Sequence, residues 1–259
     1  PPKILASSAQ RQVGKVTSAE RGTLVTMCVS ICADGNHVPP FFIFPRKKFV
    51  NRMLVGAPPG SSGAAHPSGW MTADNFMEYI KHFIRYVRCN KENPVLLILD
   101  NHESHCDVRV LNICKENGVV LLTLPPHCSH RLQPLDVTCF CPFKNYYNRA
   151  TDSWMINHPG SPVTIYDIAG IVGKVFSDGF HSRNVIHGFQ RTGISPFDPQ
   201  ILQESDYMSS YVTDRDTPVQ NNINFNDYHV DMNLSSGVLQ QVRTNHHVAS
   251  SSMKATDTS

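Results

Sequence analysis

The sequence lacks several patterns that would place it in a familiar class of protein. It has no apolar run of the roughly 20 residues that a membrane-spanning helix needs, no secretory leader and no internal repeat. A phosphate-binding loop, a dinucleotide-binding fingerprint and a Ser-His-Asp order are also missing. Several of the eight cysteines fall inside apolar runs, so we expect reduced thiols in an intracellular compartment.

Charge is sparse, at 17% of residues with a net charge of +2, and it is unevenly distributed. Residues 1–202 carry 20 Lys and Arg against 14 Asp and Glu, whereas residues 203–259 carry 3 against 7. A mildly basic core is compatible with a polyanionic partner, although many ordinary enzymes share it. The end of the chain is rich in Asn, Ser, Asp and Thr without any period. We therefore predict one folded core at 1–202 and an acidic, largely disordered tail at 203–259.

The first part of the core has the pattern of a β-hairpin. Apolar and polar residues alternate over 22–33, which predicts a half-buried strand. The sequence Asp-Gly-Asn at 34–36 is a strong turn signal, and residues 37–44 form a second β-rich run. Pro39 and Pro40 indicate a sheet edge or a bulge at the start of that run, because proline cannot donate to a sheet ladder.

Two basic stretches follow the hairpin. Residues 45–69 are rich in Gly, Pro and Ser, which predicts a surface loop. Its basic residues are Arg46, Lys47, Lys48 and Arg52. A second stretch contains Lys81, Arg85, Arg88 and Lys91. Either stretch could contact DNA phosphates, and a solvated surface is the alternative for both.

The middle of the chain predicts a βαβ unit. A continuous apolar run at 95–99, ending at Asp100, is typical of a strand buried on both faces. Residues 105–117 have helical spacing, and another apolar strand follows at 119–124. The residues at this spacing are Val108, Leu111 and Cys114. Strand, helix and strand over about 30 residues predict a parallel pair with a right-handed crossover.

Helices are predicted on either side of this unit. Thr72 is the expected N-cap of a helix over 73–89. Residues 127–135 form a loop, after which a helix begins at Asp136 and continues to about 154. Two more helices are expected, at 164–179 and 181–190.

Two carboxylates stand at positions where chemistry is often placed. Asp100 closes a buried strand, and the carboxyl ends of strands in open α/β sheets are where ligands bind. Asp136 opens a helix after the next strand. Converging aspartates would bind Mg²⁺ or Mn²⁺, and a pair of ions can activate a nucleophile at a phosphodiester. As the alternative, Asp136 could simply cap its helix.

Neighbouring polar residues allow several roles. The pairs His102-x-x-His105, His127-x-x-His130 and Cys139-x-Cys141 lack the spacings of classical zinc sites. We expect His127 and His130 to shape the loop before Asp136 or to touch substrate. We expect the two cysteines to pack in the interior. Asn101 could orient Asp100 or a metal-bound water, or make only a hydrogen bond at the strand end.

The order of motifs resembles the pogo-type transposases, the group within the mariner-like superfamily that includes the Tigger and jerky relatives. The resemblance covers about residues 1–200 and rests mainly on LLILDNHESH at 96–105 and LPPHCSHRLQPLDVTCFCPFKNYY at 124–147. Three further matches are VTSAERG at 16–22, Ala-Asp-Gly at 33–35 with the two prolines, and GFQRTGISP at 188–196.

This resemblance implies a ribonuclease H-like α/β fold, with a mixed central sheet flanked by helices. It also implies DNA cleavage and strand transfer with Mg or Mn, and it matches Asp100 and Asp136 to the second and third catalytic, metal-binding aspartates. The family's first aspartate lies on a strand before the segment that begins here. We therefore expect that N-terminal strand to be missing, the two-metal site to be incomplete and the chain alone to be inactive. Neither Asp34, in a turn, nor Glu20 is a suitable substitute.

The resemblance further implies DNA as partner, a nuclear location and no membrane, and it leaves a homodimer open. Because the chain begins with Pro1 and not methionine, we expect a fragment without the family's N-terminal helix-turn-helix domains. A domesticated or decayed transposase that binds DNA or chromatin without cutting is the alternative function. A phosphoesterase of another ribonuclease H-like group is a third possibility, against which the motif at 188–196 speaks.

Overall fold

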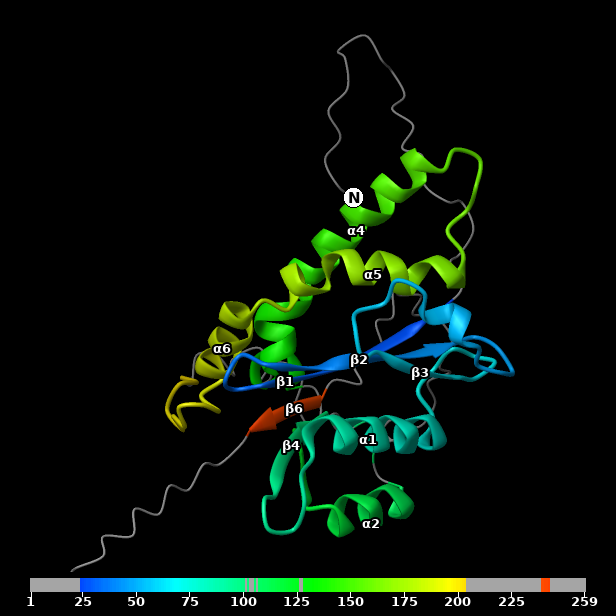
Figure 1. The fold of residues 1–259 in the computed structure, drawn as a ribbon. Coiled ribbons are helices and arrows are strands. Elements are labelled where there is room, and N and C mark those ends of the chain that lie inside the picture. The colour runs from blue at the N-terminus through cyan, green and yellow to red at the C-terminus, as the bar shows by residue number, and fades with distance from the viewer. Residues whose placement is uncertain are drawn as a thin grey trace, which may run out of the picture.

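The computed structural model describes residues 24–100, 102, 105, 107–125, 128–203 and 239–242. Its centre is a mixed six-stranded sheet in the order β3-β2-β1-β6-β4-β5. Helices cover both faces of the sheet, with α1 and α2 on one side and α4 and α5 on the other (Figure 1). This architecture is a mixed α/β fold compatible with the ribonuclease H-like class that the sequence predicts.

The predicted hairpin is present as β1, Thr26–Cys32, and β2, His37–Phe44, which pair antiparallel. In the turn between them, Asp34 Oδ1 accepts a hydrogen bond from the main-chain nitrogen of Asn36. The register shifts opposite the two prolines of β2, which confirms the predicted bulge. The prediction of a half-buried strand is wrong, because all seven residues of β1 are buried and the sheet is covered on both faces.

The segment predicted as one surface loop at 45–69 contains regular structure. A 3₁₀ turn, η1, spans Asn51–Leu54, and a short strand, β3, spans Ser62–Ala65. β3 pairs parallel with β2 and forms one edge of the sheet. The small residues of β3 have no strand pattern in the sequence. Pairing with the outer hydrogen-bonding edge of β2 decides their conformation.

The βαβ unit is confirmed. β4, Val95–Leu99, and β5, Val119–Thr123, pair in parallel, with α2, Val108–Glu116, between them. The apolar face predicted for α2 is wrong in detail, because Val108 and Leu111 are exposed while Val110 and Cys114 are buried. The helix starts three residues later than predicted, and it packs against α1 and β5.

A short strand from the predicted tail lies inside the sheet. β6, Leu239–Val242, lies between β1 and β4, parallel to β1 and antiparallel to β4. The predicted tail therefore contributes at least one ordered element. The disorder predicted for its other residues beyond Gln203 concerns a segment outside the described residues. The strand expected before residue 1 stays a prediction.

One face of the sheet is covered by α1, Ala73–Val87, whose N-cap Thr72 accepts a hydrogen bond from Asn75 N as predicted. Phe76, Tyr79 and Phe83 of this helix are fully buried. Burying an aromatic side chain of this size contributes about 1.5–3 kcal/mol relative to leaving it exposed. These three rings therefore fix the helix on the sheet.

The other face is covered by the helices of the C-terminal part, which were predicted close to their observed positions. They are α4, Phe140–Asn157, α5, Ile165–Gly179, and α6, Ser182–Arg191. The loop predicted at 127–135 contains a short helix, α3, Ser129–Leu132. A π-helical turn, η3, Leu135–Cys139, leads into α4. The apolar core on this side includes Met27 and Val29 of β1, on the face opposite to Cys28.

Candidate metal centre

Asp100 follows the last residue of β4 and is buried, with 8% of its surface exposed. The sheet ladder ends just before it, because the final bond between the strands runs from Leu124 N to Leu99 O. The carboxylate oxygen Oδ1 is buried and accepts no hydrogen bond from the described part of the chain. An unpaired buried carboxylate oxygen is costly, so this atom is suited to a cation.

His105 lies against Asp100 and was not singled out by the sequence as a partner of it. Its Nδ1 atom is 3.1 Å from Asp100 Oδ1 and 3.2 Å from the main-chain oxygen of the same residue. The N–H direction fits the main-chain oxygen, which explains why Oδ1 stays without a hydrogen bond. The ring packs on Phe76, with centroids 4.2 Å apart, and its Nε2 atom is buried without a partner.

Asp136 is the second residue of η3 and is half-buried. Burial raises the pKa of its carboxyl group, the charge of Lys144 opposes this, and the negative charge of Asp100 raises the pKa further. His130 contributes a smaller opposing effect. Asp136 does not cap the helix, because the π-helical turn begins after Pro134 and has no side-chain cap. The two aspartates are thus close enough to repel one another, although 35 residues separate them in sequence.

The position of η3 depends on close packing against α6. Thr138 Oγ1 lies 2.7 Å from the main-chain oxygen of Asn184. A Cβ atom at Gly188 would come within 2.8 Å of the main-chain oxygen of Pro134. Glycine is therefore required at 188, and this requirement gives a physical reason for the first residue of the GFQRTGISP motif.

Cys28 of β1 also lies near the aspartates. Its thiol is fully buried, and both burial and the charge of Asp100 raise its pKa far above the usual range. The thiol therefore stays neutral at physiological pH. The effect of the Asp100 charge on this thiol indicates that Cys28 lies close to Asp100.

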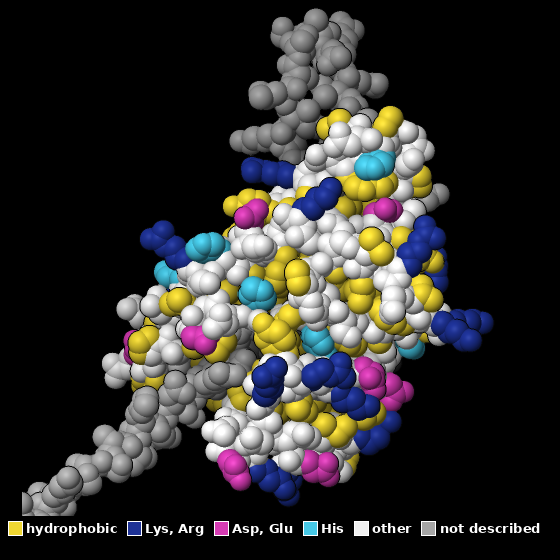
Figure 2. Space-filling view, in the orientation of Figure 1, with side chains coloured by type: hydrophobic (Ala, Val, Ile, Leu, Met, Phe, Trp, Pro, Cys, Tyr) yellow, Lys and Arg dark blue, Asp and Glu magenta, His cyan; other side chains and the backbone are white. Residues whose placement is uncertain are grey.

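The basic residues after β2 lie beyond the level of Asp100 in the sheet, because the residue before Asp100, Leu99, is level with Val38 near the beginning of β2. β2 and β4 run in the same direction, because β2 is antiparallel to β1, β6 is parallel to β1 and β4 is antiparallel to β6. The side chains of Arg46, Lys47, Lys48 and Arg52 are exposed. Arg52 also stacks over the ring of Tyr166, 5.2 Å from its centroid. Figure 2 shows Lys and Arg side chains at the edge of the molecule beyond the end of β2.

Not every residue predicted for the site can be placed. Asn101 and His127 lie outside the described residues, so their supporting roles stay predictions. Among the residues that the structure describes, no group of three or more His, Cys, Asp or Glu side chains is arranged to hold a metal ion. Cys139 is buried as predicted, whereas Cys141 is exposed, so the prediction that both pack inside is wrong for Cys141.

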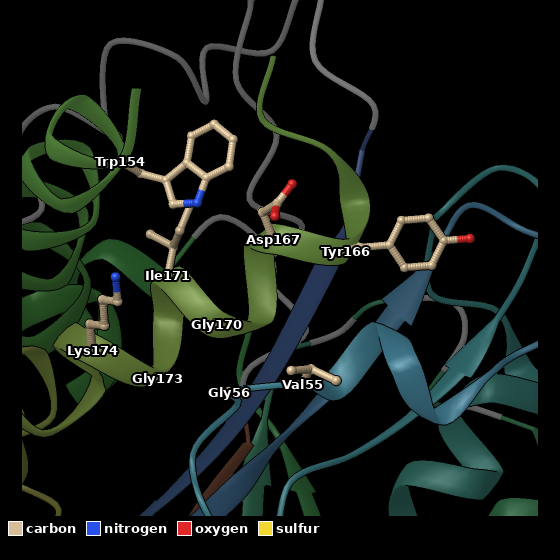
Figure 3. Close-up of a pocket in the computed structure, with 9 residues that line it drawn as sticks. All are labelled: Val55, Gly56, Trp154, Tyr166, Asp167, Gly170, Ile171, Gly173 and Lys174. Atoms are coloured by element: carbon tan, nitrogen blue, oxygen red, sulfur yellow. The ribbon is translucent and has the colours of Figure 1, made fainter. Parts of the chain in front are cut away.

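A cavity of about 400 Å³ lies elsewhere, between α5, Val55-Gly56 and the later part of α4. Figure 3 shows Trp154 and Lys174 on one side of it and Val55 on the other. Its single carboxylate, Asp167, accepts hydrogen bonds from the backbone nitrogen and hydroxyl of Thr164 as part of a helix cap. The cavity therefore has no free acidic group, and we locate the candidate site at the two converging aspartates instead.

Residues 21–172 match the family model described as DDE superfamily endonuclease. This chain belongs to the DDE superfamily endonucleases. The matched region contains both Asp100 and Asp136 and the strands and turn that position them. DDE endonucleases as a group use divalent metals and act on DNA, and the buried, unpaired Asp100 Oδ1 fits the metal requirement.

Several curated proteins are similar to this DDE domain. The chain is 24% identical over 138 residues to "Pogo transposable element with KRAB domain" of Homo sapiens, and 23% identical over 138 residues to the protein of that name from Mus musculus. Each of these matches covers 51% of this chain and 21% of the relative. Together with the family match, they support the predicted pogo-type, transposase-derived domain.

A further relative has a name of another kind. "MFS-type transporter clz9" of Cochliobolus lunatus is 32% identical over 201 residues, which are 76% of this chain and 22% of that protein. None of the helices in the described part of the DDE domain is both long and apolar enough to cross a membrane. The chain spans about a fifth of the length of the curated relatives it matches. No solved structure matches the chain.

Proposed function

We propose that this domain supplies Asp100 and Asp136 to a metal-dependent centre that cuts and transfers DNA strands in a longer protein. The observation that carries the proposal is the convergence of these two carboxylates, one at the end of β4 and one in η3. Two negative groups in a partly buried site repel each other, and a divalent cation between them would relieve that repulsion.

The residues present fit such a cation. Both candidate ligands are aspartates, which are typical ligands of Mg²⁺ and Mn²⁺, and the buried Oδ1 atom of Asp100 accepts no hydrogen bond from the residues that the structure describes. When bound, the ions would activate water or a 3′-hydroxyl and stabilise the leaving oxygen of a phosphodiester. Among the described residues, a third carboxylate does not join the two aspartates.

Basic residues of the domain would hold the DNA. The exposed basic side chains at 46–48 and Arg52 lie beyond the level of Asp100 in the direction in which β2 and β4 both run, so they would contact phosphates of a duplex that extends from the site in that direction. Lys144 and His130 lie near Asp136, and their positive charge offsets part of the repulsion between the carboxylates. DNA as substrate, nuclear location and a homodimer remain parts of the proposal, and the homodimer has no support from the relatives.

Mn²⁺ binding to the purified chain tests the proposal directly. Free Mn²⁺ measured by electron paramagnetic resonance should show one or more bound ions in the wild-type chain. Asp100→Asn and Asp136→Asn should each weaken binding by at least roughly tenfold, because each removes a ligand charge. Asp178→Asn changes an exposed aspartate on α5 and should bind as the wild type does. Equal binding by all four proteins would refute the metal site.

Cleavage separates the proposal from the alternative of a DNA-binding descendant. In a longer chain that includes the preceding segment, supercoiled DNA should be nicked in Mn²⁺, and Asp100→Ala or Asp136→Ala should abolish nicking with the fold intact. DNA binding by that longer chain without any nicking would favour the domesticated alternative. Efficient nicking by the present chain alone would overturn our expectation that its site is incomplete.

A further inference from the structure

One buried histidine, His105, contacts the candidate metal ligand Asp100. The main-chain nitrogen of His105 donates to the main-chain oxygen of His102. The side chain of His105 is then fully buried, between Phe76 and Asp100. This contact joins Asp100 to a side chain in the interior of the domain.

We propose that His105 is a positioning residue that fixes Asp100, through Nδ1, in the orientation that the metal centre requires. The proposal rests on the function proposed above and adds a residue to it. Asp100 is the first residue after the ladder, so its main-chain oxygen has no strand partner and is held by His105 Nδ1 at 3.2 Å. The same nitrogen lies 3.1 Å from Oδ1, which limits rotation of the carboxylate.

The chemistry of the ring supports a positioning role over simple packing. A neutral imidazole that donates from Nδ1 keeps an acceptor at Nε2, and this atom is buried without a partner. An apolar residue of similar size would fill the space beside Phe76 without leaving a buried nitrogen unpaired. The Nδ1 nitrogen of His105 therefore serves to hold Asp100. Metal-binding carboxylates and histidines are commonly oriented by such neighbouring hydrogen bonds.

Two substitutions separate the nitrogen from the volume of the ring. His105→Leu retains an apolar side chain against Phe76 and removes the donor. His105→Asn places an amide N–H near the position of Nδ1 and removes most of the ring. If positioning matters, His105→Leu should weaken Mn²⁺ binding about tenfold or more, and His105→Asn should restore much of that loss. A purely packing role predicts the reverse order, with the leucine variant closer to the wild type.

A second buried histidine provides the matched control. His82 on α1 is also buried, and its Nε2 atom lies 2.9 Å from the main-chain oxygen of Pro39, away from the aspartates. His82→Leu should lower the melting temperature and leave Mn²⁺ affinity of the folded chain unchanged. Circular dichroism at each titration point shows that only folded protein is compared.

The outcomes distinguish this inference from the proposed function. If the wild type binds Mn²⁺, Asp100→Asn does not and His105→Leu binds as tightly as the wild type, the role of His105 is refuted and the metal site stands. If the wild type binds no Mn²⁺, both the metal site and the role of His105 are refuted. A measurement without metal covers the case in which His105→Leu does not fold. Nitrogen-15 spectra of the wild type should show His105 protonated at Nδ1, and a ring protonated only at Nε2 would overturn the inference.

Discussion

At the scale of single residues, Asp136 shows that the candidate site is built at the expense of stability. Its carboxyl group is half-buried, and both burial and Asp100 act against its charged form. Sites that must bind a cation commonly hold like charges together in this way. The electrostatic cost should therefore be measurable in the metal-free chain.

We predict that Asp136→Asn stabilises the metal-free chain at neutral pH. In the wild type, folding raises the pKa of Asp136. The contribution of this group to the free energy of unfolding is therefore largest below the unfolded pKa of about 3.9, and it is lost as pH rises through the folded pKa. The asparagine variant has no carboxyl group at this position, so its free energy of unfolding should not fall in this way as pH rises. Each unit of pKa change corresponds to about 1.4 kcal/mol. Urea unfolding between pH 4 and pH 8 should show the two proteins diverging as pH increases.

Saturating Mn²⁺ should make the wild type more stable than Asp136→Asn, because the ion binds the folded wild type and not the variant. The exposed Asp178→Asn variant serves as the control and should follow the wild type throughout. An Asp136→Asn chain that is no more stable than the wild type at pH 7 would contradict the account.

At the scale of elements, β6 is the least expected part of the sheet. It supplies hydrogen-bonding partners to one edge of β1 and one edge of β4, two central strands that would otherwise each have an open edge. Open edges of buried strands leave backbone groups unpaired and promote aggregation. A segment of the acidic tail thus completes the sheet beside the candidate site.

We predict that a chain ending at Gln203 is less stable than the full chain. Each lost ladder bond contributes about 1 kcal/mol, so the free energy of unfolding should fall on the order of a few kcal/mol. Amide hydrogen exchange should increase at Leu97 and Ile31, whose strands lose a neighbour. A chain ending at Val242 retains β6 and should match the full chain. Equal stability of the Gln203 truncation would show that β6 contributes nothing to the fold.

At the scale of the whole molecule, the location of the charged side chains says more about DNA binding than the net charge does. The net charge of the chain is only +2, yet three exposed basic side chains at 46–48 follow one another after β2, beyond the level of Asp100 in the direction in which β2 and β4 run. A DNA duplex that reached the carboxylates would pass these cations. Their contribution should be electrostatic and independent of DNA sequence.

We predict that the chain binds DNA weakly, with a strong dependence on salt and little on DNA sequence. Replacing Arg46, Lys47 and Lys48 by Gln should lower the slope of log affinity against log salt by up to about 0.9 per lost phosphate contact. Fluorescence anisotropy with a labelled duplex at several salt concentrations measures this slope.

The matched control replaces Lys91 and Lys115 by Gln, two exposed lysines before β4 and at the end of α2. They lie at the opposite end of the parallel strands from Asp100, so their loss should change the slope much less. Equal effects of the two sets would favour a solvated surface for the segment at 46–48. Tight, salt-insensitive and sequence-specific binding would contradict the prediction altogether.

The sequence by itself determined the elements with strong local signals. The apolar run before Asp100, the turn at Gly35 and the cap at Thr72 each act through neighbours a few residues away, so hairpin, helix and βαβ unit were predicted correctly. Both aspartates were also found from sequence, because a carboxylate at a strand end is recognisable locally and the surrounding motifs resemble a known family.

Only the tertiary structure decided which of these pieces meet. The pairing of Ser62–Ala65 with β2, the entry of Leu239–Val242 into the sheet and the contact of His105 with Asp100 depend on surfaces formed by distant segments. The same holds for the repulsion between Asp100 and Asp136. Short segments without an apolar period gain their conformation from such long-range contacts, so no local pattern in the sequence could reveal them.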